Sequence, residues 1–215
     1  MAGWMIPNDD PARTVIAKRA LELGLKGDPD KAAHSLGQFH LVNGQDVNGF
    51  VVHAADAIIE DGRQIVMINR KNEPGRGELC LPGGFLDSIP GGGAESTVQA
   101  AAREAKEEVG IDVNEGQAIG TRNMYRPFDV RVARSHMPQY GIMKGDIFMV
   151  STQAVRFHVD NLEHYKPVAG DDALPGSARK VEITLLTRYS VGIPDHFDMI
   201  AQAFPEFFHQ HAIGK

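Results

Sequence analysis

The spacing of apolar positions changes near residue 49 of this 215-residue chain. Before that point the spacing is helical: Asp10 can cap a helix that begins at Pro11 and runs to about Gly24. The predicted apolar face of this helix consists of Val15, Ala17, Leu21 and Leu25. A second, weaker helix is predicted from Asp28 to Leu36.

Short β-branched runs dominate after Gly49. Val51–Ile59 and Gln64–Ile68 flank an Asp61-Gly62 pair, which is a strong hairpin signal because a type I′ turn needs positive φ at both central residues. The remaining predicted elements are strands at Leu79–Leu81, Ala118–Tyr125, Asp146–Val155 and Val181–Leu186, and a closing helix that follows Pro194 and ends or is interrupted at Pro205. Strands with helices before, between and after them predict a mixed α/β sandwich.

Residues 95–111 contain the most informative predicted helix. Ser96 followed by Gln99 forms a capping box, and Gly110 is placed to end the helix in the left-handed conformation. One stripe at helical period holds Val98, Ala101, Ala102, Ala105 and Val109. The alanines in that stripe predict close packing against a neighbouring element.

Three carboxylates lie on the opposite side of this helix. Glu104, Glu107 and Glu108 are stacked on adjacent turns, where like charges repel, and they lie toward the C-terminal end of the helix dipole, which disfavours anions. Oxygen ligands arranged in this way suit Mg²⁺ or Mn²⁺ better than zinc. The alternative is a solvated acidic face that Arg103 and Lys106 partly neutralise.

Composition narrows the class of partner. The net charge of −6 argues against a general binder of nucleic acid or of acidic membranes, so an anionic substrate would need local cations. The single cysteine, Cys80, is interpreted as a buried strand residue rather than a catalytic thiol. The start of the chain lacks a signal-peptide pattern, and no stretch approaches the ~18 apolar residues of a membrane span, so we expect a cytoplasmic protein.

The wider pattern resembles the Nudix box. The fixed positions of its second part are matched by Glu95, Arg103-Glu104, Glu107-Glu108, Gly110 and Ile111, and its entry is similar to Leu81–Asp87, with Gly84 as the first glycine. Two departures occur. Ten residues separate Gly84 from Glu95, where the family has five, and the aliphatic position after Glu104 holds the small Ala105. The spacing within the helix is left intact.

The resemblance implies a fold and an activity. The fold would be a Nudix-type α/β/α sandwich with a mixed sheet over residues 46–215, preceded by an N-terminal helical extension over residues 1–45. The activity would be magnesium-dependent hydrolysis of a nucleoside diphosphate linked to another moiety. Glu104, Glu107 and Glu108 would hold one to three Mg²⁺ ions, with Mn²⁺ as an alternative, and the backbone carbonyl of Gly83 would complete the metal shell.

Further roles follow from the same resemblance. The predicted catalytic residues are Glu107, Glu108, Arg103 and Asp172. Arg103 would pair with a box glutamate, with a plain surface salt bridge as the alternative, and Glu95 would be structural or would orient the base. The general base is left open among Asp171, Asp172, Glu182 and a box glutamate. The predicted substrate contacts are Arg70, Arg76 and Gly84, with Lys71 nearby; Tyr125, Phe128 and Tyr140 either stack on a base or pack structurally.

Two further segments resemble a Nudix subgroup associated with ADP-ribose and NAD metabolism: Asn69–Asp87, and Gly170-Asp171-Asp172 with the strand and helix after it. Leu79-Cys80 departs from the Trp-Ala usual in that subgroup. We therefore expect hydrolysis of ADP-ribose to AMP and ribose 5-phosphate. NADH, a dinucleoside polyphosphate or a nucleotide sugar are alternative substrates, and a non-catalytic ADP-ribose sensor is the alternative of another class. The resemblance also implies a homodimer.

Overall fold

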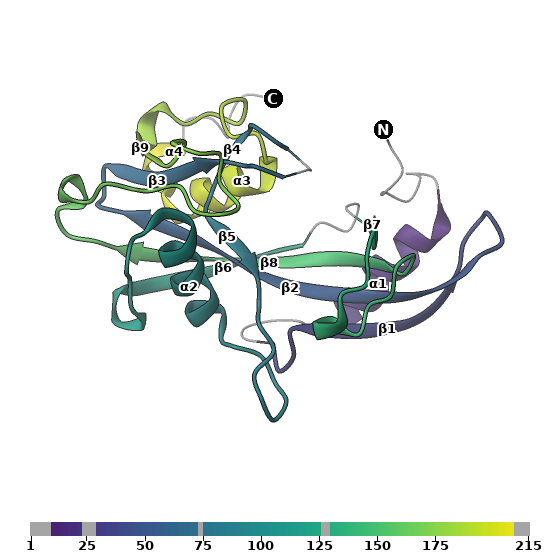
Figure 1. Ribbon diagram of the computed structural model, residues 1–215. Coiled ribbons are helices and arrows are strands. Elements are labelled where there is room, and N and C mark those ends of the chain that lie inside the picture. Colours follow the sequence, from purple (N-terminus) through teal and green to yellow (C-terminus); the bar gives the residue numbers. More distant parts are fainter. Residues whose placement is uncertain (1–9, 23–28, 73–74, 126–129, 209–215) are drawn as a thin grey trace. The chain divides into compact units, whose positions relative to one another are not determined.

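The computed structural model describes residues 10–22, 29–72, 75–125 and 130–208 (Figure 1). Its helices are α1 (Pro11–Glu22), α2 (Thr97–Val109), α3 (Pro194–Ala203) and α4 (Pro205–Phe208), with 3-10 turns η1 (Glu115–Gln117), η2 (Pro138–Tyr140), η3 (Leu162–His164) and η4 (Ile183–Leu185). Its strands are β1 (Ala33–His40), β2 (Asp46–Glu60), β3 (Gln64–Asn69), β4 (Leu79–Cys80), β5 (Gly83–Phe85), β6 (Ala118–Tyr125), β7 (Arg131–Val132), β8 (Ile147–His158) and β9 (Arg179–Glu182). The predicted α/β class is confirmed.

The strands form one sheet with the order β4-β3-β2-β8-β6, to which β1, β5, β7 and β9 are added by pairing. The predicted strand at Ala118–Tyr125 is confirmed, and the closing helix ends before Pro205 as predicted. Only the first two residues of the strand predicted at Val181–Leu186 belong to β9, because η4 begins at Ile183 once pairing with β3 ends at Glu182. Among the described residues, none of the helices has the length and apolar character needed to span a membrane.

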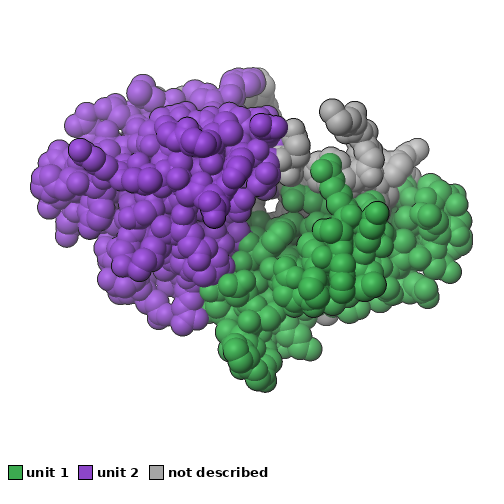
Figure 2. Space-filling model, viewed as in Figure 1, with its two compact units in different colours: residues 1–54, 85–97, 123–152 green, residues 55–84, 98–122, 153–215 purple. Residues whose placement is uncertain are grey.

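Two compact units divide the chain (Figure 2). Unit 1 contains residues 1–54, 85–97 and 123–152, and unit 2 contains residues 55–84, 98–122 and 153–215. Strands β2, β5, β6 and β8 contribute residues to both units, as does helix α2.

In unit 1, helix α1 packs on the strands through a face that differs from the predicted one. The buried residues of α1 share a four-residue spacing: Ala12, Ile16 and Ala20. The predicted face is wrong at Val15, which is 42% exposed, while Leu25 and the side chain of Leu21 lie outside the described residues. Apolar residues occupy two neighbouring stripes of this helix, and only the contact with distant strand residues such as Phe39 and Val51 decides between them. The predicted cap is confirmed, because Asp10 Oδ1 accepts the Ala12 amide at 2.9 Å.

The second helix predicted in this segment, from Asp28 to Leu36, is wrong, because Ala33–His40 is strand β1. It pairs antiparallel with the first half of β2, and the register shifts between Ser35 and Gly37, where Gly37 has φ +85°. The connecting turn contains Asn43-Gly44, with Gly44 at φ +84°. An Asn-Gly pair between apolar positions is a hairpin signal in its own right, so the sequence contained the evidence for this strand.

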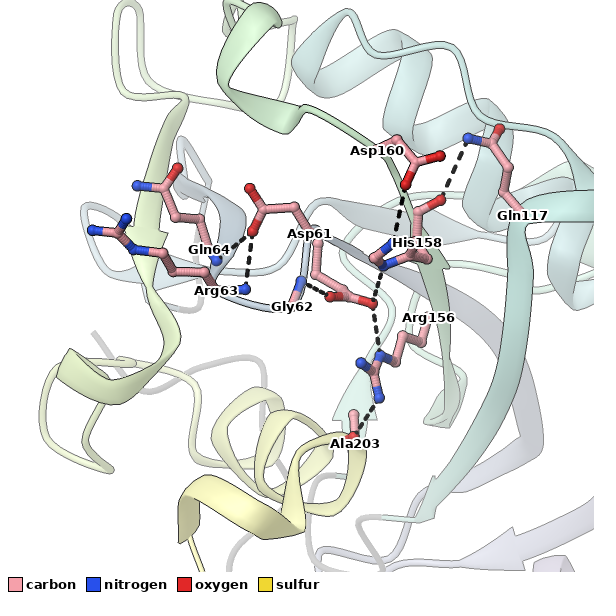
Figure 3. Close-up of polar contacts among 10 residues, drawn as sticks. Asp61, Gly62, Arg63, Gln64, Gln117, Arg156, His158, Asp160 and Ala203 are labelled. Carbon is pink, nitrogen blue, oxygen red and sulfur yellow. Dashed lines mark hydrogen bonds and ion pairs between the residues drawn. The ribbon is translucent and has the colours of Figure 1, made fainter.

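In unit 2, β2 and β3 form the predicted hairpin around Asp61-Gly62. The predicted type I′ turn is wrong: Gly62 has φ +83°, but Asp61 is not among the described residues with positive φ. The Asp61 carboxylate instead accepts the amides of Arg63 at 3.0 Å and Gln64 at 2.7 Å (Figure 3). Side-chain capping therefore replaces the second left-handed residue.

A buried ionic cluster holds the end of this hairpin to β8 and α3 (Figure 3). The Glu60 carboxylate is fully buried and accepts Arg156 Nε at 2.9 Å, with His158 Nδ1 at 3.2 Å. Arg156 also donates to the Ala203 carbonyl at 2.8 Å and lies over the Phe204 ring. One guanidinium thereby joins the hairpin, the end of β8 and the C-terminus of α3.

Replacing Glu60 with Gln should destabilise the protein by about 3 kcal/mol, because breaking a buried ion pair leaves Arg156 uncompensated. The measurement is the free energy of unfolding in denaturant. Arg63→Ala is the control, since the Arg63–Glu182 pair is exposed and its loss should leave the unfolding midpoint unchanged. Equal stability of Glu60→Gln and wild type would contradict this role of the cluster.

Candidate active site

Helix α2 carries the three predicted carboxylates and ends as predicted. Gly110 has φ +70°, its amide donates to the Lys106 carbonyl at 3.1 Å, and the Ile111 amide donates to the Ala105 carbonyl at 3.3 Å. The first of these bonds is that of an αL C-cap motif, in which the amide of the left-handed residue donates to the carbonyl four residues earlier. The end of the helix is fixed, and so is the direction of the side chains in its last turns.

Two of the three carboxylates are buried against a glycine segment. Glu104 and Glu108 are 8% and 5% exposed, one turn apart on α2. The Gly83 amide donates to Glu108 Oε2 at 2.8 Å. A Cβ at Gly84 would lie 2.3 Å from Glu104 Oε1, so the carboxylate fills the space beside this glycine. The glycines that the sequence placed in the box entry are therefore in contact with the box glutamates.

Arg103 bridges Glu104 and the third carboxylate, Glu107. Its Nη1 lies 2.6 Å from Glu104 Oε1 and 3.1 Å from Glu107 Oε2. The side chain of Glu107 is 58% exposed, in contrast to its two neighbours. The predicted proximity of Arg103 to the box glutamates is therefore present, and its guanidinium occupies the space between two of them.

The loop at residues 168–174 brings a fourth carboxylate to this helix. The Val168 amide donates to the Val109 carbonyl at 3.0 Å, and the Gly170 amide donates to the Glu108 carbonyl at 2.9 Å. A Cβ at Gly170 would lie 1.9 Å from the Glu107 carbonyl oxygen, so the close approach requires glycine. Asp172, two residues later, contributes to raising the pKa of both Glu104 and Glu108 by charge repulsion.

Asp172 is also fixed on its other side. Its side chain accepts Asn72 Nδ2 at 2.9 Å, and its carbonyl accepts the Lys71 amide at 2.9 Å. Lys71 Nζ donates to the carbonyl of Asp171 at 2.7 Å. Hydrogen bonds to the chain after β3 and to the end of α2 therefore hold this loop in place.

Burial determines the electrostatics of the cluster. It raises the pKa of Glu108 to about 7 and that of Asp56, on β2, to about 8, and it also raises the pKa of Glu104. The positive charge of Arg70 acts in the opposite direction on Asp56 and Glu108. The Asp56 and Glu108 carboxyls therefore hold protons up to near-neutral pH unless a cation compensates them.

The chemistry of these donors fits a hard divalent cation. Carboxylate and backbone oxygens are the ligands that Mg²⁺ prefers. Within the described ranges, however, no three acidic, histidine or cysteine side chains are already gathered closely enough to hold an ion. Arg103 now bridges Glu104 and Glu107, so a cation would have to displace that guanidinium.

The other predicted residues are distributed as follows. Arg70 follows directly after the last residue of β3. Its Nε is buried without a hydrogen-bond partner in the described part of the chain. Arg76 is exposed on the turn before β4. Glu182 is located away from the box helix in sequence and pairs with Arg63 at 2.7 Å beside the β2–β3 hairpin. Cys80 is buried, and burial raises its thiol pKa to about 12.

In unit 1, the inserted loop closes on itself. Glu95 Oε1 accepts the Asp87 amide at 2.8 Å, and the Glu95 amide donates to the Asp87 carbonyl at 3.0 Å, while Ser88 and Ala94 form a β-bridge. The five extra residues therefore lie in a small loop whose two ends are hydrogen-bonded to each other. Of the three predicted aromatics, Tyr140 packs edge-on against Phe85, whereas Phe128 and the side chain of Tyr125 lie outside the described residues.

Two residues near the cluster were not singled out from the sequence. Asp56 is buried on β2, and His196 is buried at the start of α3. The one sequence signal was a polar residue inside each apolar run, Val51–Ile59 and the closing helix. Their proximity to the box could not be derived, because it depends on pairing between segments that are far apart in the chain.

Substitution of the two box glycines by alanine should have different consequences. At Gly83 a Cβ would lie 2.7 Å from the Ala55 carbonyl oxygen and 2.8 Å from Asp56 Cα, so backbone must move and stability should fall by roughly 1–3 kcal/mol. At Gly84 the new Cβ meets only the end of the Glu104 side chain. We expect a smaller loss of stability for Gly84→Ala in denaturant unfolding, and a reversed order would contradict the geometry.

The metal-free protein should lose stability as the pH rises from about 4 to about 8. The pKa of Glu108 is raised to about 7 in the folded chain, so the unfolded chain releases this proton first and folding becomes less favourable across that interval. Unfolding midpoints in chelator at about pH 5 and about pH 8 measure the effect. Glu108→Gln should reduce this pH dependence and Glu115→Gln, on the exposed η1, should not; an equal dependence in all three proteins would contradict the assignment.

Comparison with known proteins places this geometry in a family. The NUDIX domain family matches residues 52–164, more than half of the chain. An ADP-ribose pyrophosphatase of Methanocaldococcus jannaschii is 43% identical over 58 residues, which is 27% of this chain and 31% of that protein. Nudix hydrolase 3 of Caenorhabditis elegans is 32% identical over 83 residues, which is 37% of this chain and 32% of that protein. The chain thus spans about a third of the length of these curated relatives.

Solved structures with similar folds include two from bacteria. A bifunctional NMN adenylyltransferase/ADP ribose pyrophosphatase of Francisella tularensis, complexed with AMP and a manganese ion, has a TM-score of 0.49 at 22% identity, covering 91% of this chain and 47% of that one. The NUDIX domain of Shewanella oneidensis NrtR, complexed with ADP ribose, has a TM-score of 0.48 at 16% identity. The match covers 72% of this chain and 86% of that one. On the extent of the family match and the box residues on α2, the chain belongs to the NUDIX family.

Proposed function

We propose that this protein hydrolyses ADP-ribose to AMP and ribose 5-phosphate in a magnesium-dependent reaction. The observation that carries the proposal is the state of Glu108. This carboxyl is buried beside Glu104, and in the described part of the chain its polar partner is the Gly83 amide, with no cationic side chain paired to it. A buried carboxylate without a counter-charge is costly, so a bound cation is the natural complement in the working state.

The substrate is proposed from similarity. The M. jannaschii relative that is 43% identical over its matching segment is an ADP-ribose pyrophosphatase. The tract around the box and the Gly170-Asp171-Asp172 loop resemble the same subgroup. The cation-bearing side of the site also suits a diphosphate, because Arg70 has an unpartnered buried Nε and Lys71 lies next to it in the chain.

In the proposed reaction the residues of this chain have separate roles. Glu104, Glu107, Glu108 and the Gly83 carbonyl would hold Mg²⁺, which when bound would supply charge neutralisation of the diphosphate and a lower pKa for the attacking water. Asp172 accepts the proton of that water as general base. Arg103, displaced from Glu104, keeps Glu107 in place. The oxygen of water joins one phosphorus, the anhydride bond breaks, and AMP and ribose 5-phosphate leave.

The anionic substrate requires contacts of its own. We assign Arg70 and Arg76 to the phosphates and the Gly84 backbone to close approach of the diphosphate, since a side chain at Gly84 would collide with Glu104. Arg forms paired hydrogen bonds with phosphate oxygens, which a single point charge does not. Replacing Arg70 with Lys would therefore remove geometry while keeping charge.

Glu107→Gln and Glu108→Gln should each lower kcat on ADP-ribose by roughly 100-fold or more, because several kcal/mol of charge stabilisation is lost with a metal ligand. The assay follows AMP and ribose 5-phosphate with Mg²⁺ present. Glu115→Gln keeps the same chemical change at an exposed site and should retain wild-type kcat. Wild-type turnover in the Glu108→Gln protein would contradict the proposal.

The alternatives predict different outcomes in the same assay. Hydrolysis of NADH, a dinucleoside polyphosphate or a nucleotide sugar in preference to ADP-ribose would keep the chemistry and replace the substrate. Binding of ADP-ribose without turnover of any of these compounds would identify a sensor.

Three further properties belong to the proposal. We propose a homodimer, testable by size-exclusion chromatography coupled to light scattering, and a cytoplasmic location. We also propose that residues 46–215 form the catalytic domain, with residues 1–45 as an extension. Since α1 packs into the core of unit 1, removal of residues 1–45 tests this division through stability as well as activity.

A further inference from the structure

Helix α3 reaches the box entry through one histidine. The Leu81 amide donates to His196 Nδ1 at 2.9 Å, and both groups are buried. A backbone amide can only donate, so Nδ1 must be the acceptor. In the neutral ring the proton is therefore on Nε2, and the hydrogen bond to Leu81 fixes both the tautomer and the ring orientation.

The opposite nitrogen of this ring faces Asp56. His196 Nε2 lies 3.5 Å from Asp56 Oδ2, which is too long for a good hydrogen bond and close enough for electrostatic attraction. Asp56 Oδ2 is buried and has no hydrogen-bond partner in the described part of the chain. A fully buried carboxyl oxygen without a partner is rare in folded proteins and calls for an explanation.

The segment between these residues and the box helix is short and held at successive points. The Pro82 carbonyl accepts the Ala57 amide at 2.8 Å, and the next amide, that of Gly83, donates to Glu108 Oε2 at 2.8 Å. A Cβ on Gly83 would lie only 2.0 Å from Asp56 Oδ1, so the Asp56 carboxyl packs directly against this glycine. Any shift of Leu81 would therefore be transmitted to the Gly83 amide, two residues away.

We propose that His196, oriented by Asp56, is a positioning residue that fixes the Leu81–Gly83 backbone and so aims the Gly83 amide at Glu108. The effect on turnover rests on the proposed function, whereas the effect on the backbone does not. Outer hydrogen-bond partners of this kind change activity by about 10–100-fold when they are removed. In this role His196 would act through the backbone and not by contact with substrate or metal.

Two substitutions separate the nitrogens of the ring. His196→Asn places a side-chain oxygen near the position of Nδ1 and keeps the acceptor for Leu81, but it does not extend to Asp56. His196→Gln places an amide nitrogen near the position of Nε2 and loses the acceptor. Asp198→Asn is the control on the same helix, because Asp198 pairs with Arg188 away from this contact.

Amide hydrogen exchange at Leu81 and Gly83 is the first measurement, made on the full chain after near-UV circular dichroism has shown that each variant is folded. We expect roughly tenfold faster exchange at Leu81 in His196→Gln, with intermediate exchange in His196→Asn and wild-type exchange in Asp198→Asn. kcat on ADP-ribose should fall about 10–100-fold in His196→Gln and be partly restored in His196→Asn, with KM changed little.

Equal exchange at Leu81 and equal kcat in His196→Gln and wild type would overturn the proposal. Should both histidine variants fail to fold, the isosteric Asp56→Asn provides the test: faster exchange at Leu81 supports orientation of the ring by Asp56, and unchanged exchange overturns it. A wild-type protein without any hydrolase activity would refute the proposed function, and the exchange data would still decide the positioning role.

Discussion

The burial of two like-charged side chains, Glu104 and Glu108, is the constraint on which the rest of the site depends. A helix surface normally leaves such residues in water, and here the glycine segment at residues 83–84 covers them. Burial raises the pKa of Glu108 to about 7, so the carboxyl is poised between binding a proton and binding a cation near neutral pH. The proposed function as a metal site rests on that balance and on the oxygen-only donors around it.

Several elements of unit 2 exist in the form that this burial requires. Glycines at positions 84 and 170 lie close against α2, and Gly83 lies close against β2, in space that a side chain would otherwise occupy. The loop at residues 168–174 adds Asp172 to the cluster, and Arg103 supplies the positive charge that now bridges Glu104 and Glu107. His196 accepts the Leu81 amide just before the glycine segment, and Asp56 lies beside His196. The position of Glu108 is therefore determined by β2, α3 and α2 together.

Local signals predicted much of this structure. The spacing within α2, the stop at Gly110 and the Asp61-Gly62 hairpin depend on neighbours in sequence, and all three are present. Some errors came where distant contacts decide, as for the face of α1, which is chosen by strands that lie tens of residues away. Others were local: the Asn43-Gly44 hairpin signal for β1 was overlooked, and the Asp61 side chain caps the turn that was expected to be type I′. Glu182 pairs with Arg63 because β9 lies against β3, and Asp56 and His196 meet only through the fold.

The most direct test of the central claim is whether divalent cation binding displaces a proton from Glu108. Isothermal titration with Mn²⁺ near pH 7, repeated in buffers of different ionisation enthalpy, gives both the affinity and the number of protons released. Wild type should bind the ion with measurable proton release, and Glu108→Gln should bind more weakly and release fewer protons. Tight binding with no proton release, or binding that is equal in the two proteins, would contradict the account.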